Sequence, residues 1–474
     1  MRTVKVDRWE GQVEIQVPKS AEVLEAEVKV EQTSDPVEAI RSALKNPLGM
    51  KPISEIVNKG SRVAVAFDDP VKVCPSYLTI PLILDELHQA GIEDDNIVLV
   101  SAGGLQPKRT RREFVENWRV SYGLAPYRTL PEKVVSEFWP RRFIRHDAAN
   151  SENLLNMGYS RLGGLVEHNR ILEDYDIVIY IGGVRSGMLG GYGGNGVVVG
   201  LGSARSISCH HGESVVGCKE SLHADPRTQL YRKHKDAVME RIEEYTGRPV
   251  FYIEGVSNSV RQWIHFLAGH FKEIREPIWQ AADRENLYPV EQADVVIAGL
   301  PKWMRYDTSR NPIVCLFSAA LILRFCLGKP VLREGGVIIL IAVCDGGIDT
   351  VACPSYPEVL ELYGRVADVR ELEEQYLEEF LSRDDYIRKY TYGSALHPIH
   401  PILLFNPTQY VHDYVGKLII ATPEKPEAVR KIGATWAKDF NHAWQMAERI
   451  VGKNPRTLVL PTFFSRPPFK FAVK

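Results

Sequence analysis

Residues 62–70 read RVAVAFDDP, a run of small and β-branched apolar residues that stops at two aspartates and a proline. A strand without polar alternation is buried on both faces, as strands inside a parallel sheet are. Four further segments of this kind follow, each ending in glycine, proline or aspartate: NIVLVSAGG (96–104), YDIVIYIGGV (175–184), ADVVIAGLP (293–301) and GGVIILIAVCDGG (335–347). The sequence therefore predicts mostly parallel or mixed sheets as the framework of the fold.

Helical patterns alternate with these strands. In residues 76–92 four leucines recur near helical spacing, and Gly91 is suited to the cap that ends a helix. Residues 226–245 and 357–391 are charged and have the pattern of surface helices. The alternation of strand and helix predicts the α/β fold class.

The length of 474 residues predicts more than one domain. A polar segment without strand periodicity, EPIWQAADRENLYPVEQ (276–292), precedes the strand that begins at Ala293. We therefore predict an N-terminal α/β domain over residues 1–285 and a C-terminal α/β domain over residues 286–474, with the active-site cleft between them. The last strand could return to the N-terminal domain.

Composition excludes several classes of partner. The net charge is −2, so nothing global favours nucleic acid. No apolar run approaches the roughly 20 residues of a membrane span, and the first residues carry charges where a signal peptide is apolar. Seven cysteines without a CxxC pair argue against a disulfide framework and against a thiolate zinc site. We expect a cytoplasmic protein with no membrane partner.

Candidate ligand-binding residues follow the predicted strands directly. Open α/β sheets bind ligands outside the carboxyl ends of their strands. Asp69 and Lys72 come after the first strand, and Arg185 comes after the third. We therefore expect these three side chains near the ligand.

A glycine-rich loop lies in residues 190–211, GGYGGNGVVVGLGSARSISCHH. Around Gly193, Gly194, Asn195 and Gly196 the backbone can approach a ligand closely and present N–H groups to an anion. No GK[ST] follows, so the loop is not a Walker A sequence. The alternative interpretation is a set of tight turns packed against a neighbouring helix.

Three histidines are candidates for chemistry. His210 and His211 are adjacent, so on a helix they diverge by about 100° and do not easily bind one metal together. His146 stands beside Asp147. For each histidine the alternative is a structural side chain that only satisfies hydrogen bonds. The residues alone thus predict an α/β ligand-binding protein with an interdomain cleft.

The ordered motifs resemble those of the lactate racemase family over most of the chain. RVAVAFDDPVKVCPS resembles the family's strand and Asp-Arg-Thr-Arg-Pro loop, and NIVLVSAGGLQP its Leu-Gly-Thr-His-Arg-Pro loop. RHDAAN resembles its Asn-His-Asp-Ala segment, and GGVIILIAVCDGG a strand of its second domain. The glycine-rich stretch resembles a family segment with a Gly-Phe-Ser-Gly-Gly-x-Lys run and a later histidine.

This resemblance implies a nickel-pincer nucleotide as cofactor. Family enzymes are thought to remove the hydrogen beside a hydroxyl and a carboxylate as hydride and to return it to either face. Asp69 and Lys72 match positions of the family's substrate and phosphate loop. His211 matches the nickel-ligating histidine, and one protein imidazole is enough because the pincer ring supplies the other ligands.

The sequence departs from the family at three functional positions. Gly196 stands where the family has the lysine that binds the nucleotide covalently, which implies non-covalent binding here. Leu105 and Gly187 stand where the family has two catalytic histidines, and neither can move a proton. The candidates to replace these as catalytic residues are His146, Tyr192 and His210.

The expected function is that of an isomerase or epimerase acting on a small 2-hydroxy acid or sugar acid. The alternative is a non-catalytic nucleotide- or metal-binding protein that kept the fold and lost the racemase chemistry. An enzyme using a nicotinamide nucleotide is disfavoured, because the chain has no strand–GxGxxG–helix unit with a downstream acidic residue. Whether the protein is a homo-oligomer stays open.

Overall fold

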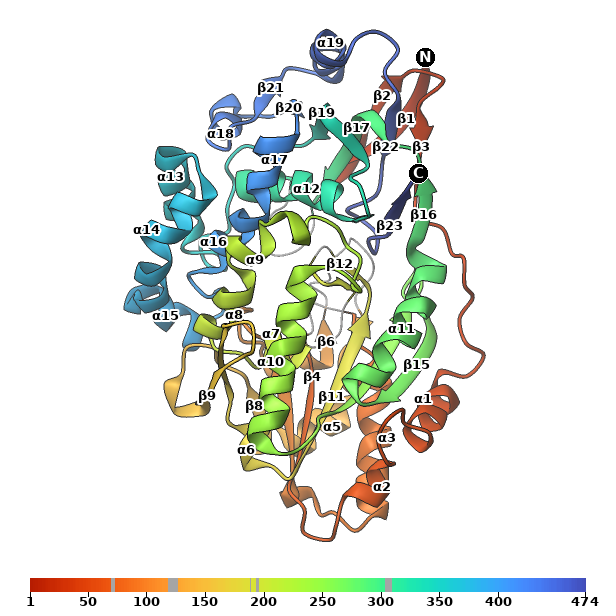
Figure 1. Ribbon diagram of the computed structural model, residues 1–474, viewed down its shortest axis with the longest axis vertical. Helices are drawn as coiled ribbons and strands as arrows, with labels where there is room; N and C mark the ends of the chain where they lie inside the picture. Colours follow the sequence, from red (N-terminus) through yellow and green to blue (C-terminus); the bar gives the residue numbers. More distant parts are fainter. Residues whose placement is uncertain (70–72, 118–126, 188, 193–195, 303–308) are drawn as a thin grey trace.

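The structure is a computed structural model and describes residues 1–69, 73–117, 127–187, 189–192, 196–302 and 309–474. Two large sheets form its framework (Figure 1). The fold class is the predicted one, mixed α/β with largely parallel strands. Lys72, Gly193, Gly194 and Asn195, all predicted to bind the cofactor, lie outside the described residues.

The first sheet has six strands and lies in the lower half of Figure 1. Its strands pair in parallel, except that β15 is antiparallel to β14 at one edge. The three predicted strands of this half are confirmed as β4, β5 and β11. In spatial order the strands are β15 (Trp263–Gly269), β14 (Phe251–Ser257), β11 (Ile177–Val184), β4 (Val63–Asp68), β5 (Ile97–Ala102) and β8 (Phe143–Arg145).

Helices cover both faces of this sheet, which explains its continuous apolar strands. On β4, Val63 and Val65 pack into one hydrophobic cluster, and Ala64 and Ala66 pack into another. The first cluster includes residues of α1 (Pro36–Lys45), α2 (Ile53–Ile56), α3 (Ser76–Gln89) and α5 (Glu132–Phe138). The second includes residues of α6 (Ile171–Asp174), α7 (Gly196–Gly200), α10 (Leu230–Thr246) and α11 (Phe271–Asn286).

The second sheet has eight strands and takes its centre from the C-terminal half. Strands β17 and β19 confirm the last two predicted strands. The main order is β2 (Gly11–Val17), β1 (Arg2–Trp9), β17 (Ala293–Pro301), β19 (Leu332–Ile341), β20 (Lys417–Ala421) and β21 (Thr435–Ala437). In addition β22 (Thr457–Leu460) pairs with β17, and β3 (Glu22–Val23) pairs with β22.

The helices of this half also lie on both sides of their sheet. Helix α19 (Phe440–Val451) packs with Ile297 and Ile339 on one face. On the opposite face a larger cluster contains Ala298, Leu340 and most of the remaining helices. These are α12 (Pro312–Arg324), α13 (Tyr356–Val366), α14 (Val369–Ser382), α15 (Asp384–Thr391), α16 (His400–Phe405), α17 (Gln409–Tyr414) and α18 (Pro426–Arg430).

Both chain ends join elements of the C-terminal half, and the two termini lie close together in Figure 1. Strands β1 to β3 belong to the eight-stranded sheet, although the predicted division placed them with the N-terminal domain. The last strand, β23 (Lys470–Val473), pairs with β16 (Leu287–Val290) and β18 (Cys326–Leu327) and with no described strand of the six-stranded sheet. The boundary at residue 285 stays a prediction.

Local signals in the sequence were accurate for helix ends. The capping box of Thr110 and Glu113 opens α4 (Arg111–Val115), and Gly91 follows α3 in the left-handed conformation. Residues 276–292, where the sequence places the domain boundary, have regular secondary structure. These residues continue α11 as far as Asn286 and then form β16, because α11 tolerates Pro277 within its length.

Short elements complete the described chain. In this part of the chain no helix has the length and apolar character that a membrane crossing needs. The elements are β6 (Glu116–Asn117), β7 (Tyr127–Arg128), β9 (Leu154–Tyr159), β10 (Leu165–Asn169), β12 (Ser186–Gly187), β13 (Gly191–Tyr192), α8 (Ala204–His211) and α9 (Glu213–Val216).

Candidate active site

The carboxyl ends of β4 and β11 meet at one buried edge of the first sheet. Asp68, the last residue of β4, accepts a hydrogen bond from the Tyr180 hydroxyl (2.5 Å) and one from the Gly183 backbone N–H (3.4 Å). Burial and the Asp68 carboxylate raise the pKa of Tyr180 well above its usual value, so Tyr180 stays a proton donor. This pair connects two predicted ligand loops.

Asp69, predicted to bind the cofactor, is paired within the protein. Its Oδ1 accepts a hydrogen bond from Arg109 Nη2 (3.1 Å), and both side chains are almost fully buried. Arg109 also lies 3.8 Å from Glu113. This ion pair fixes the carboxylate at the end of β4, and cofactor binding by Asp69 stays a prediction. The structure thus supports a positioning role for Asp69.

His146 is a buried side chain with both ring nitrogens in hydrogen bonds. Its Nδ1 is 3.1 Å from Asn169 Nδ2, and its Nε2 is 2.9 Å from the Gly202 carbonyl oxygen. Because the amide can only donate to Nδ1, Nε2 carries the proton and donates to the carbonyl. Burial lowers the pKa of His146 to about 3, so the ring is neutral. These contacts support the structural interpretation of His146.

Gly196, at the start of α7, has no room for a side chain. A Cβ atom at this position would overlap the hydroxyl group and ring of Tyr180. Tyr180 is fully buried and held by Asp68, so it cannot move aside cheaply. Gly187 differs, because a Cβ there would meet nothing nearer than the Leu189 carbonyl oxygen at 3.9 Å. The packing around Gly196 therefore leaves no room for a lysine at this position.

His210 and His211 end α8 with their rings in contact. The two Nδ1 atoms are 2.9 Å apart, and His211 Nε2 is 3.1 Å from the Tyr231 hydroxyl. His210 is buried, and burial together with the neighbouring His211 lowers its pKa well below the usual value. His211 is only partly buried. Of the two, His211 is the one that lines a cavity.

That cavity, of about 170 Å³, is lined by residues of both halves of the chain. It is smaller than the roughly 300 to 1,000 Å³ of typical ligand pockets, so its described part suits a molecule of a few heavy atoms. Its lining consists of Ala102, Gly103, Leu105, Gln106, Leu189, Val199, Gly200, Ile207 and His211 from the first half, and Phe317, His400, Leu403 and Leu404 from the second.

The lining from the second half was missed in the sequence. Residues 397–401 read HPIHP, and the spacing of its two histidines was the one signal that could have drawn attention to them. The structure brings this segment against the loop after β5. The His397 backbone N–H donates to the Leu105 carbonyl oxygen (3.0 Å), and Tyr390 donates to the Gly104 carbonyl oxygen (2.7 Å).

Lys108 strengthens the same junction. Its ammonium lies 3.3 Å from Asp147 Oδ2 and 3.5 Å from the centre of the Tyr390 ring. Burial lowers the pKa of Lys108 to about 8, against the opposing effect of Asp147. This buried ion pair lies within the first half, where it is costly to break, and the contact of the ammonium with the Tyr390 ring crosses to the second half.

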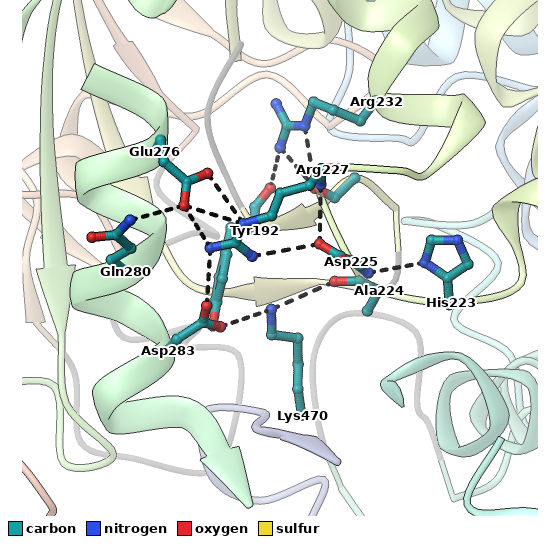
Figure 2. A network of polar contacts seen from close by, with 11 residues as sticks. Tyr192, His223, Ala224, Asp225, Arg227, Arg232, Glu276, Gln280, Asp283 and Lys470 are labelled. Atoms are coloured by element: carbon teal, nitrogen blue, oxygen red, sulfur yellow. Dashed lines mark hydrogen bonds and ion pairs between the residues drawn. The ribbon is translucent and has the colours of Figure 1, made fainter. Parts of the chain in front are cut away.

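Tyr192 and Arg185 do not line the described part of the cavity. The Tyr192 hydroxyl donates to Asp283, and burial together with that carboxylate raises the pKa of Tyr192. Figure 2 shows this tyrosine within a polar network from α11, the loop before α10 and the C-terminal strand. Arg185 is half-buried after β11. A catalytic role for Tyr192 and cofactor binding by Arg185 stay predictions.

The network of Figure 2 holds the start of the glycine-rich loop in place. Arg232 donates to the carbonyl oxygens of Gly190 (2.9 Å) and Tyr192 (2.5 Å). Lys470 lies 3.4 Å from the centre of the Tyr192 ring and 3.3 Å from Asp283. Because Lys470 belongs to β23, the end of the chain helps to position the loop that begins at Gly190.

The described residues around the cavity offer His211 as a candidate protein ligand for a metal ion. Among the described residues, no three side chains of His, Cys, Asp or Glu come together as a metal site. His211 at the cavity wall could donate to nickel if one ring nitrogen exchanges its present contact, with His210 at Nδ1 or with Tyr231 at Nε2, for the metal, and if the remaining ligands come from elsewhere. A pincer-type cofactor meets that condition, whereas its covalent attachment at Gly196 does not fit the packing.

Fold and site together define a two-sheet α/β protein that can hold a small ligand between its halves. The lactate racemase N-terminal domain matches residues 9–223. The chain is 22% identical over 432 residues to the lactate racemase of Thermoanaerobacterium thermosaccharolyticum, covering 89% of this chain and 88% of that protein. It is 22% identical over 315 residues to the lactate racemase of Lactiplantibacillus plantarum, covering 65% and 66%.

A solved structure has the same fold. The lactate racemase apoprotein from Thermoanaerobacterium thermosaccharolyticum superposes with a TM-score of 0.72 at 17% sequence identity and covers 100% of both chains. The domain match and the two relatives support the resemblance to the lactate racemase family that the motifs indicated.

Proposed function

We propose that this protein is an isomerase or epimerase of a 2-hydroxy acid or sugar acid that uses a non-covalently held nickel-pincer nucleotide. The observation that carries the proposal is the position of His211. This histidine matches the family's nickel ligand in sequence, and it lines the small cavity between the two halves. When bound, such a nucleotide supplies a hydride acceptor, which no amino-acid side chain provides.

The residues of this chain would hold and orient the reactants. His211 would supply the imidazole ligand, and its position is maintained by contacts with His210 and Tyr231. The cavity wall is otherwise rich in leucine, valine, isoleucine and phenylalanine side chains, which exclude water from the reacting carbon. The volume of about 170 Å³ favours small acids as the first compounds to screen.

Packing supports the non-covalent mode of binding. Tyr180 occupies the space that a side chain at Gly196 would need, so this position offers no amine to the nucleotide. Retention would then depend on His211 and on contacts to the phosphate. Lys72, predicted to make a phosphate contact, keeps the positive charge of the family's arginine but cannot form its bidentate hydrogen bonds.

The test is to express the protein together with the enzymes that build the nucleotide and to measure nickel and nucleotide mass. We expect about one nickel per chain, and the nucleotide in native but not in denaturing mass spectra. His211→Ala should lose the nickel. His412→Ala is the matched control, because His412 is an exposed histidine of α17 that also contacts a tyrosine hydroxyl.

Two results would contradict the proposal. A nucleotide adduct that survives denaturation would show covalent attachment at another residue. Unchanged nickel content in His211→Ala would remove His211 from the metal site. If nickel is bound as expected, lactate and then larger 2-hydroxy acids and sugar acids would be screened for interconversion of stereoisomers.

The alternative is a non-catalytic nucleotide- or metal-binding protein. The observation that favours it is the pair Leu105 and Gly187, which stand in place of the family's two catalytic histidines. Leu105 lines the cavity, so the wall is apolar where a family enzyme has a base. Protein that binds nickel and nucleotide but turns over no acid in the screen would support this alternative.

A further inference from the structure

The cavity wall offers few groups that can exchange a proton. Among its described lining residues, the ionisable side chains are His211 and His400, and Gln106 adds one amide. The remaining lining residues are glycine, alanine, aliphatic residues and phenylalanine. If His211 binds a metal, its imidazole cannot also act as a base for the substrate. His400 is then the described side chain at this wall whose chemistry suits proton transfer.

His400 lines the same cavity as Leu105, and a backbone hydrogen bond joins the two segments. The His397 backbone N–H donates to the Leu105 carbonyl oxygen (3.0 Å), and the His400 backbone N–H donates to the His397 carbonyl oxygen (3.0 Å). The turn from 397 to 400 is therefore fixed on the loop after β5. Leu105 and His400 line the same cavity from opposite halves of the protein.

The ring of His400 is oriented by a buried tyrosine. Its Nδ1 lies 2.8 Å from the Tyr356 hydroxyl oxygen, and the two rings are stacked with centroids 6.1 Å apart. Tyr356 is fully buried, so the orientation is rigid. In the tautomer that donates from Nδ1 to the tyrosine oxygen, Nε2 carries a lone pair. Burial lowers the pKa of His400 to about 4, which keeps the imidazole neutral.

We propose that His400 faces the bound 2-hydroxy acid and exchanges the proton of its hydroxyl group, a role for which Leu105 has no suitable group. In this step the O–H bond breaks, its electron pair stays on the oxygen, and the proton binds Nε2 of His400. The reverse step returns the proton to either stereoisomer. This inference rests on the proposed function, since it needs a hydroxy acid in the cavity.

The test combines kinetics with a binding signal that does not depend on turnover. His400→Gln and His400→Asn are compared with His412→Gln, whose histidine has the same kind of contact, 2.8 Å to the Tyr363 hydroxyl, but does not line the cavity. For nickel-loaded protein we expect kcat for a 2-hydroxy acid substrate to fall about 10² to 10⁴ fold in the His400 variants, with a much smaller change in KM. The His412 variant should match the wild type.

The second readout is the imidazole ¹⁵N signal of His400 in unloaded protein labelled with ¹⁵N-histidine. The signal is assigned by its loss in whichever His400 variant folds. Addition of L-lactate or D-lactate should shift this signal and leave that of His412 unchanged. A merely structural histidine would show neither the ligand-induced shift nor a kcat effect without a matching loss of folded protein.

The outcomes separate the two proposals. Wild-type turnover that persists in both His400 variants would overturn the role of His400 and leave the proposed function in place. Loaded wild type without turnover of any hydroxy acid would overturn the proposed function, and the proton exchange with it. Lactate turnover without any shift of the His400 signal would place the acid away from His400 and overturn this inference alone.

Discussion

Tyr180 occupies the space that any side chain on Gly196 would need, and Asp68 holds the tyrosine there through a hydrogen bond of 2.5 Å. The position that the motif resemblance matches to the family's covalent anchor is thus closed by the packing of this chain. A lysine could not be restored at this site by one substitution. A side chain at position 196 would require a smaller residue at position 180.

This relationship predicts different costs for alanine at two glycines. Gly196→Ala should lower the free energy of unfolding by about 1 to 3 kcal/mol, because the methyl group overlaps a rigid buried ring. Gly187→Ala should change it by less than about 1 kcal/mol, since its nearest neighbour is at 3.9 Å. Urea unfolding of both variants checks the difference.

A double-mutant cycle tests the cause. In the double variant Tyr180→Ala with Gly196→Ala, the second substitution should cost less than it does alone, because the clash is gone. Additive costs would show that the Gly196 position is sensitive for another reason, such as the start of α7.

A second prediction concerns His146 and acid stability. Its pKa is about 3 in the folded protein and about 6.5 in an unfolded chain. Between these values the unfolded chain binds the additional proton, so the free energy of unfolding decreases as pH falls below about 6.5. One such group contributes a slope of about 1.4 kcal/mol per pH unit. His146→Gln should make the pH dependence between pH 4 and 6 shallower by about this amount.

The same variant distinguishes a structural from a catalytic His146. A glutamine amide can accept from Asn169 and donate to Gly202, which preserves both contacts. Turnover by loaded His146→Gln should therefore stay near that of the wild type, whereas a catalytic histidine would cost about 10² to 10⁴ fold. His88→Gln, at an exposed site, controls for general effects on the pH dependence of unfolding.

A third prediction concerns the two members of one ion pair in Figure 2. Asp283→Asn leaves the fully buried Lys470 ammonium without its carboxylate, and should cost about 3 kcal/mol of unfolding free energy. Lys470→Met should cost less than about 1 kcal/mol. Its apolar chain still covers the Tyr192 ring, and Asp283 keeps Arg227 at 3.3 Å.

Thermal unfolding of both variants measures this asymmetry. Equal costs would mean that Lys470 and Asp283 contribute as one unit to the position of β23. A cost for Lys470→Met well above that for Asp283→Asn would contradict the account of the lysine as a buried charge that depends on its partner.

The sequence predicted local features well because their causes are local. The continuous apolar runs at 62–70 and 175–184 required burial on both faces and became β4 and β11. Gly91, expected to end a helix, follows α3 in the left-handed conformation. His211 was predicted as a nickel ligand because it matches a family motif, and that role stays a prediction.

Contacts between distant segments could not be predicted in this way. His400 and His211 line the same cavity although they are 189 residues apart in the sequence. No feature near residues 397–401 indicates this contact. Likewise, Asp69 and His146 looked suited to chemistry as single residues. Their partners Arg109 and Asn169 are brought to them only by the folded sheet.

The same limit applies to the N-terminal strands, which give the last prediction. Val6, Ile15 and Val17 pack in one cluster with Val295 and Ile297, and Arg8 pairs with Leu300. Residues 286–474 expressed alone would expose this face of the second sheet. We expect that fragment to show broad thermal unfolding and weak near-ultraviolet circular dichroism, because its core is incomplete.

Adding the N-terminal segment back should restore a folded unit. The Glu27 backbone N–H donates to the Tyr288 hydroxyl (2.8 Å), so residues 1–30 end close to the start of the fragment and a short Gly-Ser linker can join them. The joined chain should unfold cooperatively, with a sharp transition and strong near-ultraviolet signals. Cooperative unfolding of residues 286–474 without this segment would mean that β1 to β3 only cover a core that is already complete, which would favour the predicted boundary at 285 as a true limit of independent folding.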